Sequence, residues 1–279
     1  MDAALAAALA VAEEIADEAG AIARAGLGRA REVTHKRSAG DLVTEFDLAV
    51  ERAAVARLRA AFPGDRIVGE EGGEGGAGDA ARRWYVDPID GTTNFAHGLP
   101  FFCVSIGLCD EVGPAVGIVD APALGWRFSA ARGGGAHLRE RGGVARRLAV
   151  SGTTRLEDAL LATGFPYDLR ASAEDNVREF VALQRAAQAV RRVGAAALDL
   201  AMVAAGWFDG YWEQKIKPWD IAAGAVLVTE AGGRVSGYTG DPLRLDGGQI
   251  VATNGRVHDA LVVALADARR GGPCIEGPA

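Results

Sequence analysis

Apolar residues recur at helical spacing in two segments near the start of the 279-residue chain. The first segment follows Asp2 and extends to about Gly26. The second extends from Leu48 to about Phe62 and stops at Pro63–Gly64, a pair that ends helices. Both segments place their apolar side chains on one face. We therefore predict two helices, capped at their N-termini by Asp2 and Asp47.

Short apolar runs separated by glycines follow these two segments. One run, Trp84–Val86, enters a polar stretch directly. The next four read "FFCVSIGLC", "GPAVGIVDAP", "GWRFSAARGG" and "GAHLRE". Short strands with glycine turns at this spacing predict an antiparallel sheet.

The pattern changes near Gly142–Arg147, where helical and strand-like segments begin to alternate. Predicted helices cover Ser172–Val190, Ala195–Gly206, Trp219–Ala231 and Val257–Arg270, and predicted strands cover Leu160–Thr163, Arg234–Ser236 and Gln249–Ala252. This alternation is typical of α/β folds. We therefore predict an N-terminal α+β subdomain, residues 1–145, and a C-terminal α/β subdomain, residues 146–279.

Composition narrows the classes of function. The chain is 49% hydrophobic and 24% charged, an ordinary globular balance, and its net charge of −7 disfavours binding to nucleic acid or anionic lipid. No apolar run is long enough to span a membrane. The apolar run Ala4–Ala12 has no basic segment before it and is followed by Glu13–Glu14, unlike a signal peptide. Three cysteines without paired spacing fit a reducing compartment, so we expect a cytoplasmic protein.

Carboxylates stand at the ends of several apolar elements. Asp87 and Asp90 follow a strand in "WYVDPIDGTTN", Glu70 follows the apolar pair Ile67–Val68, and Asp220 begins an apolar helix. Taken singly, each is explained equally well as a turn, cap or solvated loop residue. If they converge, their repulsion must be offset by cations. Oxygen ligands without Cys or His select Mg²⁺, with Mn²⁺ as a substitute.

Five motifs, in order along the chain, resemble those of the inositol monophosphatase family. "DPIDGTTNF" (Asp87–Phe95) and "KPWDIAAGAVLVTEAGG" (Lys217–Gly233) resemble its two signatures. "GDLVTEFD" (Gly40–Asp47), "GEE" (Gly69–Glu71) and "GFPY" (Gly164–Tyr167) match in the expected order. The resemblance implies an α-β-α-β-α layered sandwich, a homodimer, lithium sensitivity, and hydrolysis of a small phosphate monoester with two or three Mg²⁺ ions per site.

The resemblance also implies a role for each matched position. Glu70, Asp87 and the Ile89 carbonyl would hold one metal ion. Asp87, Asp90 and Asp220 would hold a second, and Glu70 would also contact a third, more weakly bound ion. Glu70 and Thr92 would orient the attacking water, with Asp47 supporting Thr92. The Gly91 and Thr92 amides would receive the phosphate. The alcohol would lie against Asp90, Gly194, Ala195, Ala196, Glu213 and Asp220.

Ala195 departs from the family pattern, because members commonly carry Ser or Thr there. The missing hydroxyl removes one hydrogen bond of about 0.5–1.5 kcal/mol to a substrate hydroxyl. The departure weakens the case for inositol, but inositol-1-phosphate stays the leading substrate that the resemblance implies. Histidinol phosphate, fructose 1,6-bisphosphate and 3′-phosphoadenosine phosphate remain as alternatives, and a regulatory binding module that keeps the fold without turnover is the non-enzyme alternative.

Overall fold

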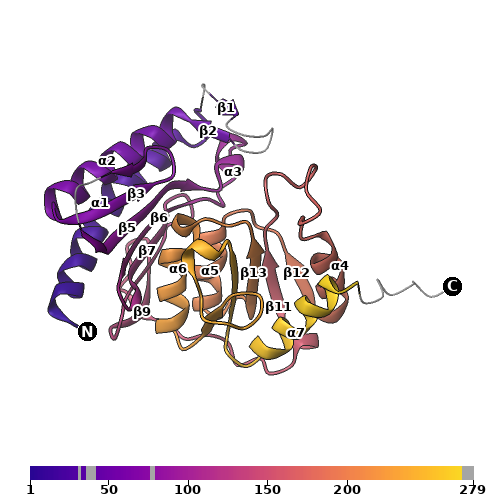
Figure 1. Ribbon diagram of the computed structural model, residues 1–279. Helices are drawn as coiled ribbons and strands as arrows, with labels where there is room; N and C mark the ends of the chain where they lie inside the picture. The colour runs from indigo at the N-terminus through magenta and orange to yellow at the C-terminus, as the bar shows by residue number, and fades with distance from the viewer. Residues whose placement is uncertain (31–32, 36–41, 76–78, 272–279) are drawn as a thin grey trace.

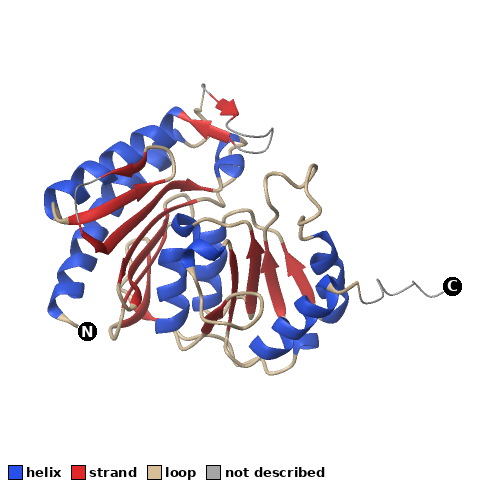
Figure 2. Ribbon diagram, in the orientation of Figure 1, coloured by secondary structure: helices blue, strands red, loops and turns tan. Residues whose placement is uncertain are grey.

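The computed structural model describes residues 1–30, 33–35, 42–75 and 79–271 (Figure 1). Its helices and strands form five layers, helix, sheet, helix, sheet and helix, as Figure 2 shows. The α-β-α-β-α sandwich expected from the sequence is confirmed. In the described part of the chain, no helix has the length and apolar character needed to cross a membrane.

The first two layers come from the N-terminal half. Helices α1 (Ala3–Gly26) and α2 (Glu45–Ala61) pack on one face of an eight-stranded sheet, and a buried apolar cluster fills the space between them. The strand order is β10-β9-β8-β7-β6-β5-β3-β4. The strands are β3 (Asp65–Gly69), β4 (Gly73–Gly75), β5 (Asp79–Asp90), β6 (Cys103–Asp110), β7 (Gly113–Ala121), β8 (Trp126–Ala131), β9 (Gly135–Glu140) and β10 (Arg146–Arg147).

The other three layers come mostly from the C-terminal half. Helices α5 (Ala196–Ala204) and α6 (Pro218–Glu230) lie between the two sheets. The second sheet has the order β12-β11-β13-β15-β14. Its strands are β11 (Leu160–Thr163), β12 (Ala189–Arg191), β13 (Gly210–Gln214), β14 (Arg234–Ser236) and β15 (Gln249–Thr253). Helices α4 (Val177–Ala186) and α7 (His258–Arg269) cover its outer face.

Smaller elements complete the chain. They are β1 (Val33–His35), β2 (Leu42–Thr44), α3 (Thr92–Ala96) and two short 3₁₀ helices, Leu156–Asp158 and Leu245–Gly247. Of the Gly40–Asp47 motif, Gly40 and Asp41 lie outside the described residues. The predicted boundary near residue 145 falls between the strands of the two sheets in sequence, and the division into two subdomains stays a prediction.

The predicted cap of the second helix is wrong by one turn. Thr44 is the N-cap, and its hydroxyl accepts hydrogen bonds from the Phe46 and Asp47 amides. Asp47 is the third helical residue and its carboxylate accepts from the Thr44 amide at 2.8 Å, which closes a capping box. The helix therefore starts three residues before Leu48, and Asp47 is buried within its first turn.

The predicted helix over Ser172–Val190 is also too long. Helix α4 begins only at Val177, because Asn176 has the left-handed backbone angle φ 67°. The chain then leaves the helix at Ala187 to form β12, which pairs in parallel with β11. Strand pairing across the sheet thus overrides the local helical pattern.

Helix α6 approaches the first sheet unusually closely. A Cβ atom on Gly117 of β7 would lie 2.5 Å from the Ala223 carbonyl oxygen, and one on Gly107 of β6 would lie 2.8 Å from the Ala223 amide. On the other side of α6, Gly224 leaves room for Leu200 of α5. A Cβ atom on Gly224 would lie 2.5 Å from the Leu200 Cβ. These glycines let a helix that is buried on all sides sit between the two sheets, with Asp220 in its first turn.

We expect Gly117→Ala to destabilise the protein by about 1–3 kcal/mol, since the added methyl group meets helix backbone that no side-chain rotation can relieve. Chemical denaturation with the free energy of unfolding as readout measures this. Gly64→Ala is the matched control: it has nothing within 4 Å of the added atom, so it should be neutral or slightly stabilising. Equal stability changes in the two variants would contradict the close-packing argument.

Candidate active site

A cavity of about 310 Å³ opens where the ends of β3 and β5 meet the first turns of α5 and α6. Every residue of the sequence-predicted site lines it except Asp47, which lies behind the wall. The lining residues from that prediction are Glu70, Asp87, Ile89, Asp90, Gly91, Thr92, Gly194, Ala195, Ala196, Glu213 and Asp220. Segments up to 150 residues apart in the sequence (70 to 220) thus meet at one place.

The end of β5 shapes the centre of this cavity. The polar residues after Val86 predict a turn at Asp87, but the strand continues to Asp90, with a shift in register against β6 between these two residues. Such a bulge re-aims side chains at a strand end, and Pro88, which has no amide hydrogen to donate, lies within it. The turn itself begins at Gly91, whose φ of 92° favours glycine, and α3 starts at the next residue.

Thr92 is held from behind by the first turn of α2. Its Oγ1 lies 3.2 Å from Asp47 Oδ1 and 2.9 Å from the Ile89 carbonyl oxygen, and both oxygens are acceptors. Asp47 Oδ2 in turn accepts from the Thr44 amide and hydroxyl. Burial raises the pKa of Asp47, while the Thr44 and Thr92 hydrogen bonds act in the opposite direction. The Thr92 hydroxyl therefore has a fixed orientation at the cavity wall.

Asp90 is held by the N-terminus of α5. The Ala196 amide donates to its Oδ1 at 3.1 Å and the Ala197 amide to its Oδ2 at 2.7 Å. The Cys103 thiol also lies 3.5 Å from Oδ2. A helix N-terminus stabilises a carboxylate through its free amides and its dipole. The turn that lines the alcohol side thus also positions a candidate metal ligand.

Glu51 of α2 organises the loop that carries Glu70. Its carboxylate accepts from the Glu71 amide at 2.8 Å and from the Gly72 amide. A Cβ on Gly69 would come within 2.4 Å of this carboxylate, so the glycine permits the approach. Glu51 has no signal in the sequence, because a glutamate within a helix looks like a solvated surface residue and only the folded contact shows its role.

The acidic groups at the cavity raise one another's pKa values. Burial, followed by the charge of Glu70, holds the pKa of Asp87 and of Asp220 well above the usual range. Burial raises the pKa of Asp90 to about 6, against the effect of its hydrogen bonds from α5. Asp87 Oδ1 is buried and has no hydrogen-bond partner among the described residues. Carboxylates crowded in this way need protons or cations to offset their repulsion.

This donor set fits a hard divalent cation. It consists of carboxylate oxygens and a backbone carbonyl, the ligands that Mg²⁺ prefers, and the unpartnered Asp87 Oδ1 is an acceptor without a donor. Over the part of the chain that the structure describes, no group of three or more His, Cys, Asp or Glu side chains is arranged so that it could hold a metal ion as it stands. The ligand roles therefore stay proposals.

Glu213 forms another acidic part of the wall. The Tyr211 hydroxyl donates to it from the same face of β13, two residues away. Burial is the main reason that the pKa of Glu213 rises to about 7; Asp90 also raises it, while Tyr211 and Arg192 lower it. A Cβ on Gly164 would lie 2.2 Å from the carboxylate, so Gly164 lets the following loop pass close to Glu213.

Comparison with known proteins identifies the family. The sequence pattern of the inositol monophosphatase family matches residues 4–270. An inositol-1-monophosphatase from Synechocystis sp. is 46% identical over 257 residues, covering 91% of this chain and 88% of that protein. The chain belongs to the inositol monophosphatase family. The family and the phosphatase class predicted from the five motifs are thereby confirmed.

Two further relatives bear on this member of the inositol monophosphatase family. The solved structure of an inositol monophosphatase from Anabaena (Nostoc) sp. PCC 7120 has a TM-score of 0.85 and 42% identity, covering 94% of this chain and 96% of that one. The Nus factor SuhB of Pseudomonas aeruginosa is 45% identical over 237 residues, covering 83% of this chain and 85% of that protein. The family thus includes proteins named for different functions.

Several cavity residues of this family member were missed from the sequence. Asp199, Arg192 and Lys215 line the cavity. Lys215 pairs with Asp168 at 2.8 Å and donates to Ser172 at 2.6 Å, which ties the loop after Gly164 to the end of β13. The sequence does not distinguish a charged residue that lines a cavity from one that is exposed to solvent. Only the fold therefore identifies Asp199, Arg192 and Lys215 as cavity residues.

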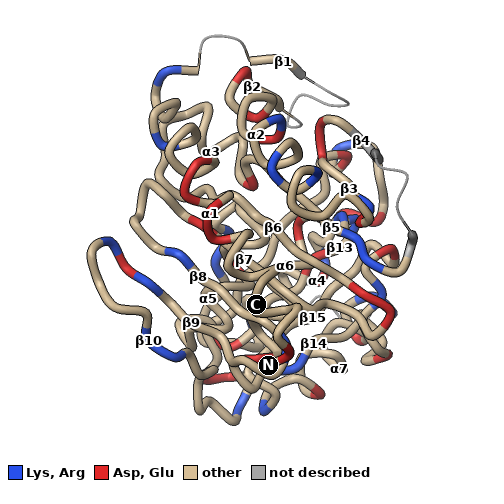
Figure 3. Tube along the Cα trace, turned by 90° about the vertical axis from the view of Figure 1, so that its left-hand side faces the viewer, with Lys and Arg blue, Asp and Glu red and all other residues tan. Residues whose placement is uncertain are grey.

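A second cavity of the same volume, about 310 Å³, lies between α1 and the β8–β9 hairpin. It contains none of the predicted site residues. Its central guanidinium, Arg127, already pairs with Asp17 at 2.6 Å and with Asp120 at 2.7 Å. Figure 3, which faces this side, shows basic and acidic stretches alternating along the neighbouring β9–β10 hairpin. The charges here are largely balanced, so the acidic cavity is the candidate active site.

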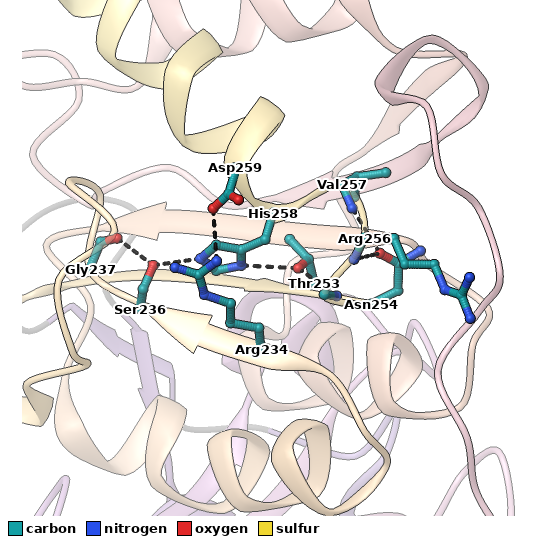
Figure 4. Close-up of polar contacts among 10 residues, drawn as sticks. Arg234, Ser236, Gly237, Thr253, Asn254, Arg256, Val257, His258 and Asp259 are labelled. Carbon is teal, nitrogen blue, oxygen red and sulfur yellow. Dashed lines mark hydrogen bonds and ion pairs between the residues drawn. The ribbon is translucent and has the colours of Figure 1, made fainter.

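A buried serine and histidine also meet at the start of α7, as Figure 4 shows. Ser236 Oγ lies 2.9 Å from His258 Nε2 and donates to the Gly237 carbonyl, so it accepts from the ring. Thr253 Oγ1 lies 3.0 Å from Nδ1, and it accepts from the Gly255 amide. Asp259 pairs with Arg234 instead of the histidine. A nucleophile would donate its proton to the ring, so this is a structural network.

The His258 network predicts a pH dependence of stability. Burial, with the Arg234 charge, lowers the pKa of His258 from 6.5 to about 4. Between pH 4 and pH 6.5 the folded state then binds fewer protons than the unfolded state. The contribution of His258 to the free energy of unfolding is therefore full above pH 6.5 and is lost as the pH falls to 4. It amounts to about 3 kcal/mol at most.

We expect His258→Gln to be less stable at pH 7 and to show a shallower rise of unfolding free energy between pH 4 and 6.5 than the unmodified protein. Urea denaturation at several pH values measures both slopes. Parallel slopes in the two proteins would contradict the role assigned to His258.

Proposed function

We propose that this protein hydrolyses inositol-1-phosphate to inositol and phosphate in a Mg²⁺-dependent reaction with water. The observation that carries the proposal is the convergence of Glu70, Asp87, Asp90 and Asp220 on one cavity, with Asp87 Oδ1 buried and unpartnered. The Synechocystis relative, named an inositol-1-monophosphatase, supports the choice of substrate.

Glu70, Asp87, the Ile89 carbonyl, Asp90 and Asp220 would hold the metal. When bound, Mg²⁺ supplies charge neutralisation, a more acidic water and stabilisation of the leaving alkoxide. Two ions would fit the two overlapping sets of ligands that the family motifs imply. Mn²⁺ would substitute, because it accepts the same oxygen donors.

Thr92 and Glu70 would orient the attacking water. The Thr92 hydroxyl hydrogen points to Ile89 or Asp47, which leaves its oxygen free to accept a hydrogen bond from water. Asp47 fixes that orientation from behind, because Thr44 fixes Asp47. The carboxylate of Glu70, at the edge of β3, would accept the second water hydrogen.

The phosphate and the alcohol would occupy opposite parts of the cavity. The amides of Gly91 and Thr92 begin α3 and would donate to the phosphate. Gly194, Ala195, Ala196 and Glu213 line the alcohol side. A homodimer, a cytoplasmic location and inhibition by lithium remain predictions from the sequence.

The first test is phosphate release from inositol-1-phosphate, with Mg²⁺ and with excess chelator. We expect release with Mg²⁺ and loss of nearly all activity on chelation, restored by added Mg²⁺. Histidinol phosphate, fructose 1,6-bisphosphate and 3′-phosphoadenosine phosphate form the comparison panel. If no substrate in this panel releases phosphate, the enzyme proposal fails and the non-catalytic binding module takes its place.

Asp90→Asn tests the metal ligands. The amide keeps the shape of the side chain but loses the charge, so we expect kcat to fall by at least about 100-fold with a higher Mg²⁺ requirement. Circular dichroism and thermal melting check that the fold persists. Asp110→Asn, at the end of β6 and outside the cavity lining, is the matched control and should leave kcat unchanged. Near-normal turnover in Asp90→Asn would remove Asp90 from the ligand set.

A further inference from the structure

One carboxylate in the cavity wall has no role in the site described so far. Asp199 lies in the first turn of α5, is 1% exposed and lines the cavity. Its Oδ1 is buried without a hydrogen-bond partner among the described residues. A buried polar atom without a partner is costly, so each one in a native structure calls for an explanation. This oxygen therefore needs a donor when the site is in use.

Asp199 lacks a donor because of the residue at position 195, which precedes it by four residues. Ala195 is the N-cap of α5 and makes no side-chain cap hydrogen bond. The Asp199 amide donates to the Ala195 carbonyl at 2.9 Å, so the two residues stand one turn apart, and both line the cavity. This hydrogen bond holds the two residues close together at the start of the helix. A hydroxyl at position 195 would lie beside Asp199, and alanine supplies none.

The neighbouring carboxylates already have donors. Asp90 accepts from two amides of α5, and Glu213 accepts from the Tyr211 hydroxyl. Burial holds the pKa of Asp199 well above the usual range, Asp90 and Glu213 raise it further, and Arg192 lowers it. A second anionic group on the alcohol would meet these acidic neighbours, whereas a hydroxyl would supply the hydrogen that Asp199 lacks.

We propose that Asp199 is a specificity-determining residue whose Oδ1 accepts a hydrogen bond from a hydroxyl group of the leaving alcohol. The inference rests on the proposed phosphatase function and narrows its substrate class to phosphate monoesters of polyols. Asp199 does not act on the phosphate, so its contribution is absent for a substrate whose leaving group carries no hydroxyl donor.

The test compares Asp199→Ala and Asp199→Asn on inositol-1-phosphate and on p-nitrophenyl phosphate, whose leaving group has no further hydroxyl. We expect Asp199→Ala to lower kcat/KM for inositol-1-phosphate about tenfold or more, mostly through KM, with little change for p-nitrophenyl phosphate. Asp199→Asn keeps an acceptor of the same shape and should recover part of the loss. Equal losses on both substrates, or no loss on inositol-1-phosphate, would overturn the proposal.

Product binding tests the same residue without turnover. Calorimetry with myo-inositol should show about tenfold weaker binding to Asp199→Ala than to the unmodified protein, while inorganic phosphate binds both equally. This result would stand even if phosphate release failed, so the failure of the proposed function and that of Asp199 are distinguishable. Equal inositol binding by the two proteins, or none by the unmodified one, counts against Asp199.

Ala195→Ser tests the explanation for the unpartnered oxygen. The family pattern predicts that a hydroxyl at position 195 binds the substrate. Beside the unpartnered Asp199 we expect the opposite: the new hydroxyl would donate to Asp199 and compete with the substrate, which lowers the ratio of inositol-1-phosphate to p-nitrophenyl phosphate turnover. When Ala195→Ser is added to the Asp199→Ala variant, the ratio should stay the same as in Asp199→Ala alone. An equal change in both backgrounds would contradict the coupling between the two positions.

Discussion

Repulsion between carboxylates that the fold forces together is the constraint on which the site depends. Asp87 and Asp90 come from the end of β5, Glu70 follows β3, and Asp220 lies in the first turn of α6; each of these elements is anchored in an apolar core. Burial and mutual charge raise the pKa values of the three aspartates. The free energy of packing the two sheets around α5 and α6 offsets this repulsion, and a divalent cation would relieve it. The site therefore combines a rigid scaffold with an affinity for cations.

Backbone contacts maintain this arrangement where side chains alone would move apart. Gly107 and Gly117 let α6 approach the first sheet, which places Asp220 opposite β5. Asn94 donates to the Phe101 and Val193 carbonyls, which ties α3 to the chain just before α5. Ser105 donates to the Trp219 carbonyl at the start of α6. These contacts hold α6, α3 and the chain before α5 against one another and against the first sheet, so the backbone sets the relative positions of the carboxylates.

The sequence predicted the chemistry of the site better than its supports. Asp87 and Asp90 could be found because a short motif places them after an apolar strand. The role of Asp47 in capping was predicted a turn away from where it lies, since Thr44 competes for the same position. Glu51 and Asp199 could not be found, because a buried carboxylate in an amphipathic or apolar helix has no local signal. Their significance comes only from contacts with residues far away in the sequence.

The first turn of α5 serves two parts of the site at once. Its amides at Ala196 and Ala197 hold Asp90, and the same turn presents Ala195 and Asp199 to the alcohol side. Exchange of this turn for that of another protein, in order to change the preferred alcohol, would also shift a residue that serves the phosphate half. Substrate preference in this fold is therefore not a detachable module. Evolution or engineering that alters it must keep the two amides in place and vary only the side chains.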